Sequence, residues 1–129
     1  MNSDNNTDKI TLTINFIDPD LSSEELDDET VQLLGELINR SDIEAVDRVR
    51  NLNPPDGNKS IGGFLTGLLK AEVNPANALK VLGYLGDRLG NKPISIEVEG
   101  NGKKLKVSAN SREEFDFAMK KAQEFIEGK

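Results

Sequence analysis

The 129-residue sequence contains no cysteine, no histidine and no tryptophan, and its aromatic side chains are limited to five phenylalanines and one tyrosine. Without cysteine, the chain forms no disulfide and offers no thiolate to a metal ion. Without histidine, it lacks the commonest general base and zinc ligand, which excludes Ser-His and Cys-His catalysis. We therefore predict a protein that is not an enzyme, with no catalytic, cofactor or metal site.

Motifs for nucleotide and calcium are incomplete. In a phosphate-binding P-loop glycine directly precedes lysine, whereas here Asn58 separates Gly57 from Lys59. The stretch "DPDLSSEELDDE" has acidic residues near the ligand positions of an EF-hand loop. It carries Ser23, however, where that loop needs glycine for its sharp turn. Neither stretch predicts a bound cofactor.

The net charge of −7 is unevenly distributed. Fourteen acidic and four basic residues precede Lys59, whereas nine acidic and twelve basic residues lie from Lys59 onward. An acidic chain lacks the basic footprint that nucleic acid and anionic lipid require, so we expect neither as a main partner. The simplest interpretation is a solvated acidic face. The alternative is an acidic surface that binds a basic partner protein.

The sequence divides into a short polar tail and a single domain. Residues 1–8 are small and polar with no apolar anchor, which predicts a disordered N-terminal tail. Residues 9–129 have the length of a single domain. The polar, acidic start is the opposite of a signal peptide, and the lack of cysteine suits a reducing compartment. We therefore expect a cytoplasmic protein.

The first half of the domain contains one strand, one helix and one ambiguous segment. Apolar residues alternate through "KITLTINFID", which is typical of a half-buried strand. A helix follows, with a capping box formed by Ser22 and Glu25. Residues 43–50 fit a strand or a helix, and we favour a strand before the Pro-Pro loop. The expected apolar stripe of the helix consists of Val31, Leu34, Leu37 and Ile38.

The glycine-rich stretch "GNKSIGGFLTGLLKAEVNPANALKVLGYLGDRLGNK" is interpreted as two short helices. The first spans about 60–71, with Ser60 as a possible N-cap. The second starts at Asn74, its N-cap, with Pro75 at the first helical position, where a missing N–H costs nothing. The glycines would let these two helices approach closely or would weaken them, so we expect the pair to be the least stable element.

The final third is interpreted as a β-hairpin and a helix. Apolar residues alternate in "PISIEVEGNGKKLKVSAN" on both sides of a Gly-Asn-Gly turn, and the lysines of its second arm suit an edge strand. Ser111 and Glu114 predict a capping box for the last helix. The chain is therefore expected to be α+β, about four strands with helices packed on the sheet, in the order β-α-β-α-α-β-β-α.

Two other functions for the segment 60–90 stay open at this stage. Membrane contact is possible but not favoured, because Lys70 and Glu72 interrupt apolar runs that are much shorter than the roughly 20 residues of a spanning helix. Binding of a small phosphate-containing ligand at the Gly62-Gly63 helix start is the other. Self-association is also open, because an acidic half and a mildly basic half can pair.

From Val46 to Phe125 the order of these features resembles the effector-associated constant component family of bacteria. The segments that carry the resemblance are "VDRVRNLNPPDGNKSIGG", the apolar stretch after it, "PISIEVEGNGKKLKVSA" and a terminal helix that begins at an acidic turn. The segments "ITLTINF" and "DETVQLLGELI" also fit the layout. The resemblance implies a small α+β component of a multi-gene conflict, or defence, system, and it implies no catalytic residues. Family members carry a more continuous apolar stretch, suggestive of membrane contact, where this chain has Lys70, Glu72 and Asn74.

We expect a non-enzymatic protein-interaction or regulatory component of such a bacterial system. A partner protein would bind at the acidic first helix, at the glycine-rich segment, or at both. The candidate partner-binding residues are Glu24, Glu25, Asp27, Asp28, Gly62, Gly63, Phe64 and Gly67.

Overall fold

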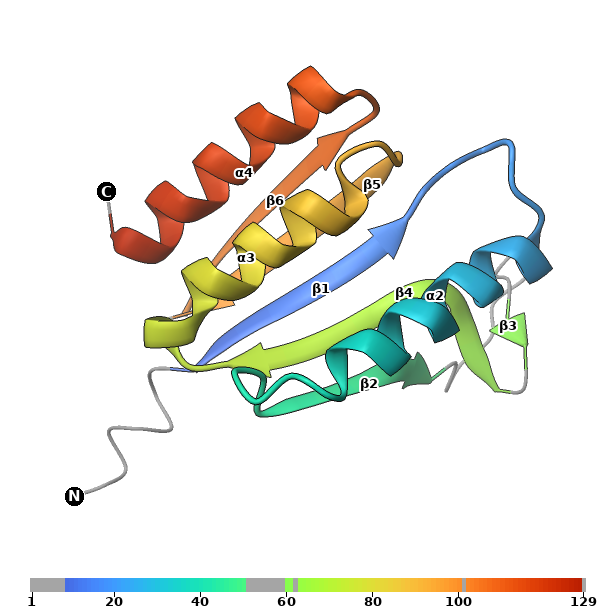
Figure 1. Cartoon of the computed structure of the whole chain (residues 1–129), viewed down its shortest axis with the longest axis horizontal. Coiled ribbons are helices and arrows are strands. Elements are labelled where there is room, and N and C mark those ends of the chain that lie inside the picture. The colour runs from blue at the N-terminus through green and yellow to red at the C-terminus, as the bar shows by residue number, and fades with distance from the viewer. Residues whose placement is uncertain (1–8, 51–59, 62, 101, 129) are drawn as a thin grey trace.

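The computed structural model describes residues 9–50, 60–61, 63–100 and 102–128. An antiparallel sheet carries three helices, labelled here as in Figure 1, and this confirms the predicted α+β class. In chain order the elements are β1 (Ile10–Phe16), α2 (Ser23–Leu37), β2 (Ala45–Arg50), β3 (Ser60–Ile61), β4 (Phe64–Val73), α3 (Pro75–Leu89), β5 (Ile94–Gly100), β6 (Lys103–Ala109) and α4 (Arg112–Glu127).

The strand order across the sheet is β2-β4-β1-β5-β6, and the short β3 pairs with β4. Strands β1 and β2 lie on either side of β4, and strands β4 and β5 lie on either side of β1. The unit β1-α2-β2-β4-α3-β5 therefore has the interleaved β-α-β-β-α-β connectivity of ferredoxin-like sheets. Strand β6 and helix α4 extend this unit at one edge, which leaves β2 as the outermost strand at the other edge.

All three helices lie on one face of the sheet (Figure 1). The core fills the space between this face and the helices, with Leu12 and Ile14 of β1 packed beneath a buried stripe of α3 that includes Leu82 and Leu85. On β1, these buried residues alternate with half-buried polar ones such as Thr13, as predicted for a half-buried strand. The other face of the sheet therefore carries polar side chains.

The predicted helix starts of α2 and α3 are confirmed. The backbone N–H of Glu25 donates to Ser22 Oγ at 3.1 Å, and the N–H of Ser22 donates to Glu25 Oε1 at 2.8 Å. At α3, the N–H of Asn77 donates to the Asn74 side chain at 3.0 Å, with Pro75 in the first turn. Each cap satisfies backbone donors that have no partner within the helix, which stabilises a helix by about 1 kcal/mol.

The predicted helix over 60–71 is wrong, because this segment forms β3 and most of β4. The three leucines and the phenylalanine of this run fit a helical stripe, but pairing with β1 buries Leu69, Ala71 and Val73 with the two-residue period of a strand. Gly63 and Gly67 have positive φ angles, 85° and 83°, which a helix does not contain. Tertiary pairing overrides local propensity here, and the element order is β-α-β-β-β-α-β-β-α.

Strand β4 bulges at Gly67. Arg48 of β2 pairs with Leu69 of β4, but Arg50, two residues later, pairs with Phe64. The extra residues of β4 include Gly67, whose left-handed φ suits glycine best. A Cβ atom built on Gly67 would lie 3.1 Å from the carbonyl oxygen of Phe16, so the close approach of the two strands also favours glycine.

The hairpin of β5 and β6 is confirmed, with Gly100 paired to Lys103 and Gly102 at a φ of 75°. β6 is the predicted edge strand. The capping box predicted for α4 is only half formed: the N–H of Glu114 donates to Ser111 Oγ at 3.2 Å, but Glu114 Oε1 accepts the N–H of Asn110 instead of that of Ser111.

One further prediction is confirmed, and two others concern residues that the structure does not describe. The strand favoured for residues 43–50 is confirmed as β2. The tail predicted for residues 1–8, and the predicted partner-binding residue Gly62, lie outside the described residues.

Candidate functional site

The two segments that carry the predicted partner-binding residues meet at Arg48, a residue that the sequence did not single out. The Arg48 guanidinium donates to a carboxylate oxygen of Asp27 on α2. The same guanidinium lies over the ring of Phe64 on β4, 4.9 Å from its centroid, and Arg50 lies over this ring at 5.4 Å. Two of the predicted residues are thus joined through β2, and both are fixed in place by these contacts.

The other predicted acidic residues occupy the first two turns of α2. Glu24 and Asp28 are exposed. Glu25 is exposed as well, but its carboxylate is used in the capping box with Ser22. Acidic side chains at this position interact favourably with the positive end of the helix dipole. They therefore have a structural role, and Glu24 and Asp28 also present negative charge to solvent.

The described glycines of the predicted set have structural roles. Gly63 is exposed in the turn between β3 and β4, and Gly67 is buried at the bulge. The helix start proposed as a phosphate site at Gly62-Gly63 does not form, because a strand follows. These glycines shape the strand and do not converge on a ligand.

Two large aliphatic side chains, Val31 of α2 and Ile38 at its C-cap, are exposed, contrary to the prediction that they belong to the core stripe. Val31 retains 47% of its accessible surface and Ile38 retains 63%. They share a flank of the helix with Asp27, since residues four and eleven positions apart lie on one side of a helix. Asp27 reaches Arg48 on β2, whereas Glu36 on the opposite flank reaches α3. Val31 and Ile38 therefore face the β2 edge of the sheet.

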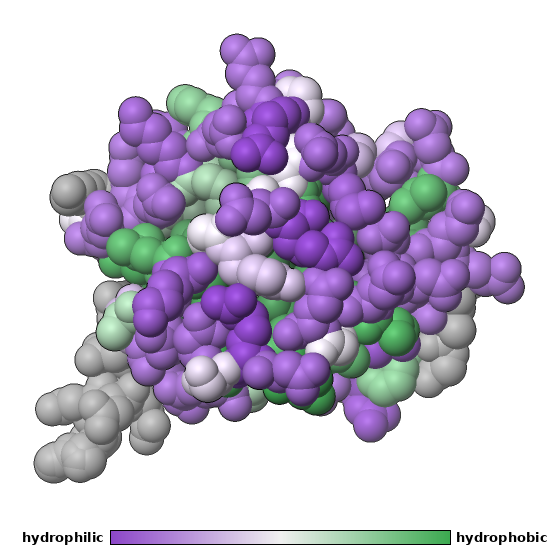
Figure 2. Space-filling view, in the orientation of Figure 1, coloured by the Kyte–Doolittle hydropathy of each residue, from purple (hydrophilic) through white to green (hydrophobic). Residues whose placement is uncertain are grey.

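We refer to the flank of α2 carrying Asp28, Val31 and Ile38, together with strand β2, as the α2–β2 surface. On the helical face hydrophilic residues predominate, and hydrophobic residues form small areas, some of them along the margin where α2 and β2 lie (Figure 2). A shallow groove of about 320 Å³ runs along β2 and is lined by residues 45–50 with Lys70 and Glu72. This surface thus combines apolar side chains, charge and a strand edge that none of the described strands covers.

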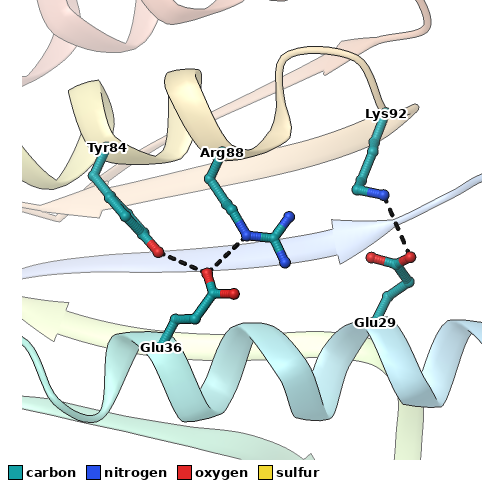
Figure 3. Close-up of polar contacts among 5 residues, drawn as sticks. All are labelled: Glu29, Glu36, Tyr84, Arg88 and Lys92. Carbon is teal, nitrogen blue, oxygen red and sulfur yellow. Dashed lines mark hydrogen bonds and ion pairs between the residues drawn. The ribbon is translucent and has the colours of Figure 1, made fainter.

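Helix α2 is tied to α3 by charged hydrogen bonds (Figure 3). The Tyr84 hydroxyl donates to Glu36 Oε1 at 2.6 Å, and Arg88 Nε donates to the same oxygen at 2.7 Å. Nearer the start of α2, Lys92 Nζ lies 3.3 Å from Glu29 Oε2. These contacts hold the inner flank of α2 against α3 and so fix the direction in which its outer flank points.

The contacts between α2 and α3 shift the pKa values of Glu36 and Tyr84. The guanidinium of Arg88 holds the pKa of Glu36 below its usual range, although partial burial opposes this effect. Burial raises the pKa of the Tyr84 hydroxyl, and the hydrogen bond to Glu36 raises it further. Glu36 is therefore a carboxylate and Tyr84 a neutral donor at neutral pH, the state in which their hydrogen bond forms.

The turn between α2 and β2 is fixed by a second ion pair. Arg40 donates to both carboxylate oxygens of Asp42, at 2.9 and 2.7 Å, and this bidentate pairing lowers the pKa of Asp42. The Arg40 guanidinium also lies 4.3 Å from the centroid of the Tyr84 ring. The chain therefore enters β2 from a held turn, which positions the strand beside α2.

A third exposed apolar side chain lies elsewhere, on α4. Phe117 retains 63% of its surface and is accompanied by Lys121, whose ammonium lies 5.3 Å from the ring centroid. Its helix covers the β6 end of the sheet, far from β2 in the strand order. Phe117 therefore serves as a comparison site for Ile38 in the experiments below.

Comparison with protein-family models, with curated proteins and with solved structures finds no match to this chain. Within the described part of the chain, no helix has the length and apolar character needed to cross a membrane.

Proposed function

We propose that this chain is a non-enzymatic protein-interaction component that binds a partner protein through the α2–β2 surface. The observation that carries the proposal is the exposure of Val31 and Ile38 on one flank of a helix that otherwise buries its apolar residues. Aliphatic side chains grouped beside a strand edge are typical of a protein interface, and within the described part of the chain the outer edge of β2 has no strand partner. The contacts of Glu36 with α3 keep this flank turned outward.

The exposed acidic residues of the α2–β2 surface favour a partner protein with a basic surface. Glu24 and Asp28 are exposed on α2, and Asp47 is exposed on β2. Such acidic side chains at the rim of an interface attract a basic surface and mainly raise the rate of association. This supports the alternative interpretation of the acidic N-terminal half, a surface that meets basic residues.

The regulatory role in a bacterial conflict system rests on the sequence resemblance described above. A component of this kind acts through its contacts and needs no reaction centre of its own. The structure leaves less support for the membrane and phosphate functions considered for residues 60–90. Many apolar side chains of that segment, including Leu69, Val73, Leu82 and Leu85, lie in the core.

Affinity capture from the native cell tests the proposal. Tagged wild-type protein is compared with Val31→Lys, Ile38→Lys and, as a matched control of equal exposure to Ile38, Phe117→Lys. We expect the first two variants to lose proteins that the wild type and Phe117→Lys retain. All three should stay folded, because an exposed substitution usually changes stability by less than about 0.5 kcal/mol. Equal capture by all four proteins, or equal loss in Phe117→Lys, would contradict the proposal.

A further inference from the structure

We infer that the partner protein presents a basic amphipathic helix, and that one large apolar side chain of this helix fills a hole on α2 formed by Val31, Leu34, Gly35 and Ile38. The inference rests on the proposed function, because it names the kind of partner segment that the α2–β2 surface binds. Three observations carry it: the spacing of the exposed residues of α2, the open space at Gly35, and the acidic side chains at one end of the same flank.

The outer flank of α2 has the residue spacing of a helix–helix contact. Five exposed residues follow one another at intervals of four and three along the chain: Glu24, Asp28, Val31, Gly35 and Ile38. This seven-residue repeat brings side chains into one line along a helix. Ile38 has helical backbone angles at the C-cap, and its N–H makes a helical hydrogen bond, so the line continues to the end of α2. A second helix is the partner element that matches such a line.

The apolar part of this flank surrounds a hole. Packed helices insert a side chain between four residues of the facing helix, which are neighbours at i, i+3, i+4 and i+7. Val31, Leu34, Gly35 and Ile38 have this spacing. A Cβ atom built on Gly35 meets nothing within 4 Å, so the glycine corner of the hole is empty. Leu34 is half-buried, and Val31 and Ile38 are exposed. The hole is therefore apolar and open outward, and it suits a large side chain such as leucine or phenylalanine.

The backbone around the hole is held in place. The Asn39 side chain donates to the carbonyl oxygen of Gly35 at 3.1 Å. Glu36, the next residue, accepts from Tyr84 and Arg88 of α3. Gly35 thus lies in a helix that is fixed before any partner binds. A site that is already ordered loses little conformational entropy on binding, which favours affinity.

The acidic end of the flank indicates a basic partner helix. Glu24 and Asp28 are exposed, and neither has an ion-pair partner among the described residues. They precede Val31 by two turns and one turn of the helix. Lysine or arginine on the partner helix would face them at the rim of the contact and mainly raise the rate of association. The same acidic side chains repel an anionic lipid surface.

A second copy of α2 fits this flank less well than a basic helix. In an antiparallel pair of α2 helices centred on Gly35, Asp28 of one copy would lie near the C-terminal end of the other. That end carries the negative pole of the helix dipole, and α2 has no basic residue in its last turn. In a parallel pair, Glu24 and Asp28 would each face their own copy, and like charges brought together disfavour association.

Binding of synthetic helices to the full chain tests the inference, with fluorescence anisotropy as the readout. The first probe has leucine at the a and d positions of about three heptads and lysine at most others. The second has glutamate in place of lysine. The third has the composition of the first, but leucine and lysine alternate, which favours a strand. We expect only the first probe to bind. No binding of the first probe at millimolar concentration, or equal binding by either of the others, would overturn the inference.

Gly35→Leu is the decisive variant, and Gly83→Leu is its matched control. Gly83 is also an exposed helical glycine with nothing within 4 Å of its Cβ position, but it lies on α3. Both variants should stay folded, because leucine is a better helix former than glycine. Gly35→Leu fills the hole and should weaken binding of the first probe roughly tenfold or more, whereas Gly83→Leu should leave it unchanged. Equal affinities of the two variants would overturn the inference.

The outcomes separate this inference from the proposed function. Proteins from the native cell that are lost with Val31→Lys but retained with Gly35→Leu would leave the α2–β2 surface as an interface and overturn the helix that fills the hole. Sedimentation equilibrium tests the second copy as an occupant, and we expect the free chain to be monomeric. A dimer of the wild type that Gly35→Leu dissociates would assign the hole to a second copy and overturn the inference equally.

Discussion

Replacing Gly67 with alanine tests whether the segment after Gly63 is a bulged strand or a helix, because the two structures predict opposite signs. In a helix, alanine is more favourable than glycine by about 1 kcal/mol, so Gly67→Ala would stabilise the protein. In the strand, residue 67 has a φ of 83°, a left-handed conformation that costs an L-residue about 1–2 kcal/mol.

The surroundings of Gly67 add to this cost. Its new Cβ would lie 3.1 Å from the backbone oxygen of Phe16, and a backbone oxygen held in a sheet cannot move away freely. At Gly63 the φ is similar, 85°, but nothing lies within 4 Å of the new Cβ. We expect Gly63→Ala to lower the free energy of unfolding by about 1 kcal/mol and Gly67→Ala to lower it by about 2–3 kcal/mol.

Urea unfolding followed by circular dichroism measures both changes, with Gly35→Ala as a helical control. Gly35 is exposed in α2 with nothing within 4 Å of its Cβ position, so alanine there should stabilise by about 0.5–1 kcal/mol. A stabilising Gly67→Ala would refute the strand assignment. Equal losses for Gly63→Ala and Gly67→Ala would show that the contact with Phe16 carries no cost.

Three further predictions concern the contacts that hold the helices. Glu36→Gln should lower the free energy of unfolding by about 1 kcal/mol. Arg88 lowers the folded-state pKa of Glu36. The Glu36 carboxylate therefore stabilises the fold fully above its unfolded pKa of about 4.3, and this stabilisation is lost as pH falls through the lower folded pKa. The melting temperature of Glu36→Gln should accordingly depend less on pH in this range than that of the wild type. Ser22→Ala removes the N-cap of α2 and should cost about 1 kcal/mol in urea unfolding, whereas an unchanged midpoint would argue against the capping box. Leu85→Ala empties a fully buried position and should cost about 2–5 kcal/mol by the same assay, and a loss below 1 kcal/mol would show that α3 is not packed as described.

Local signals in the sequence placed most elements correctly. The alternation through β1, the cap residues Ser22, Asn74 and Ser111, and the glycine turn of the last hairpin each act within a few residues, so they can be identified without the fold. The helix prediction for residues 60–71 was wrong because it also rested on local signals alone. Its leucines satisfy a helical stripe, and only the pairing of β4 with β1, which lies far away in the chain, decides between helix and strand.

The candidate site was predicted in part. The acidic residues of α2 and Phe64 were identified from the sequence, but their connection through Arg48 was not, because Arg48 is 21 residues from Asp27 and no local pattern links them. Val31 and Ile38 were assigned to the core stripe. Helical spacing alone gives the position of a residue around the helix, but it does not give the width of the face that the sheet covers.

Photo-crosslinking at residue 38 tests the central claim most directly, namely that the α2–β2 surface is a protein interface. A crosslinking amino acid replaces Ile38 in one protein and Phe117 in another, since both side chains are 63% exposed, and each protein is irradiated in the native cell. We expect defined protein adducts from position 38. Adducts of equal yield from position 117, or none from position 38, would contradict the claim.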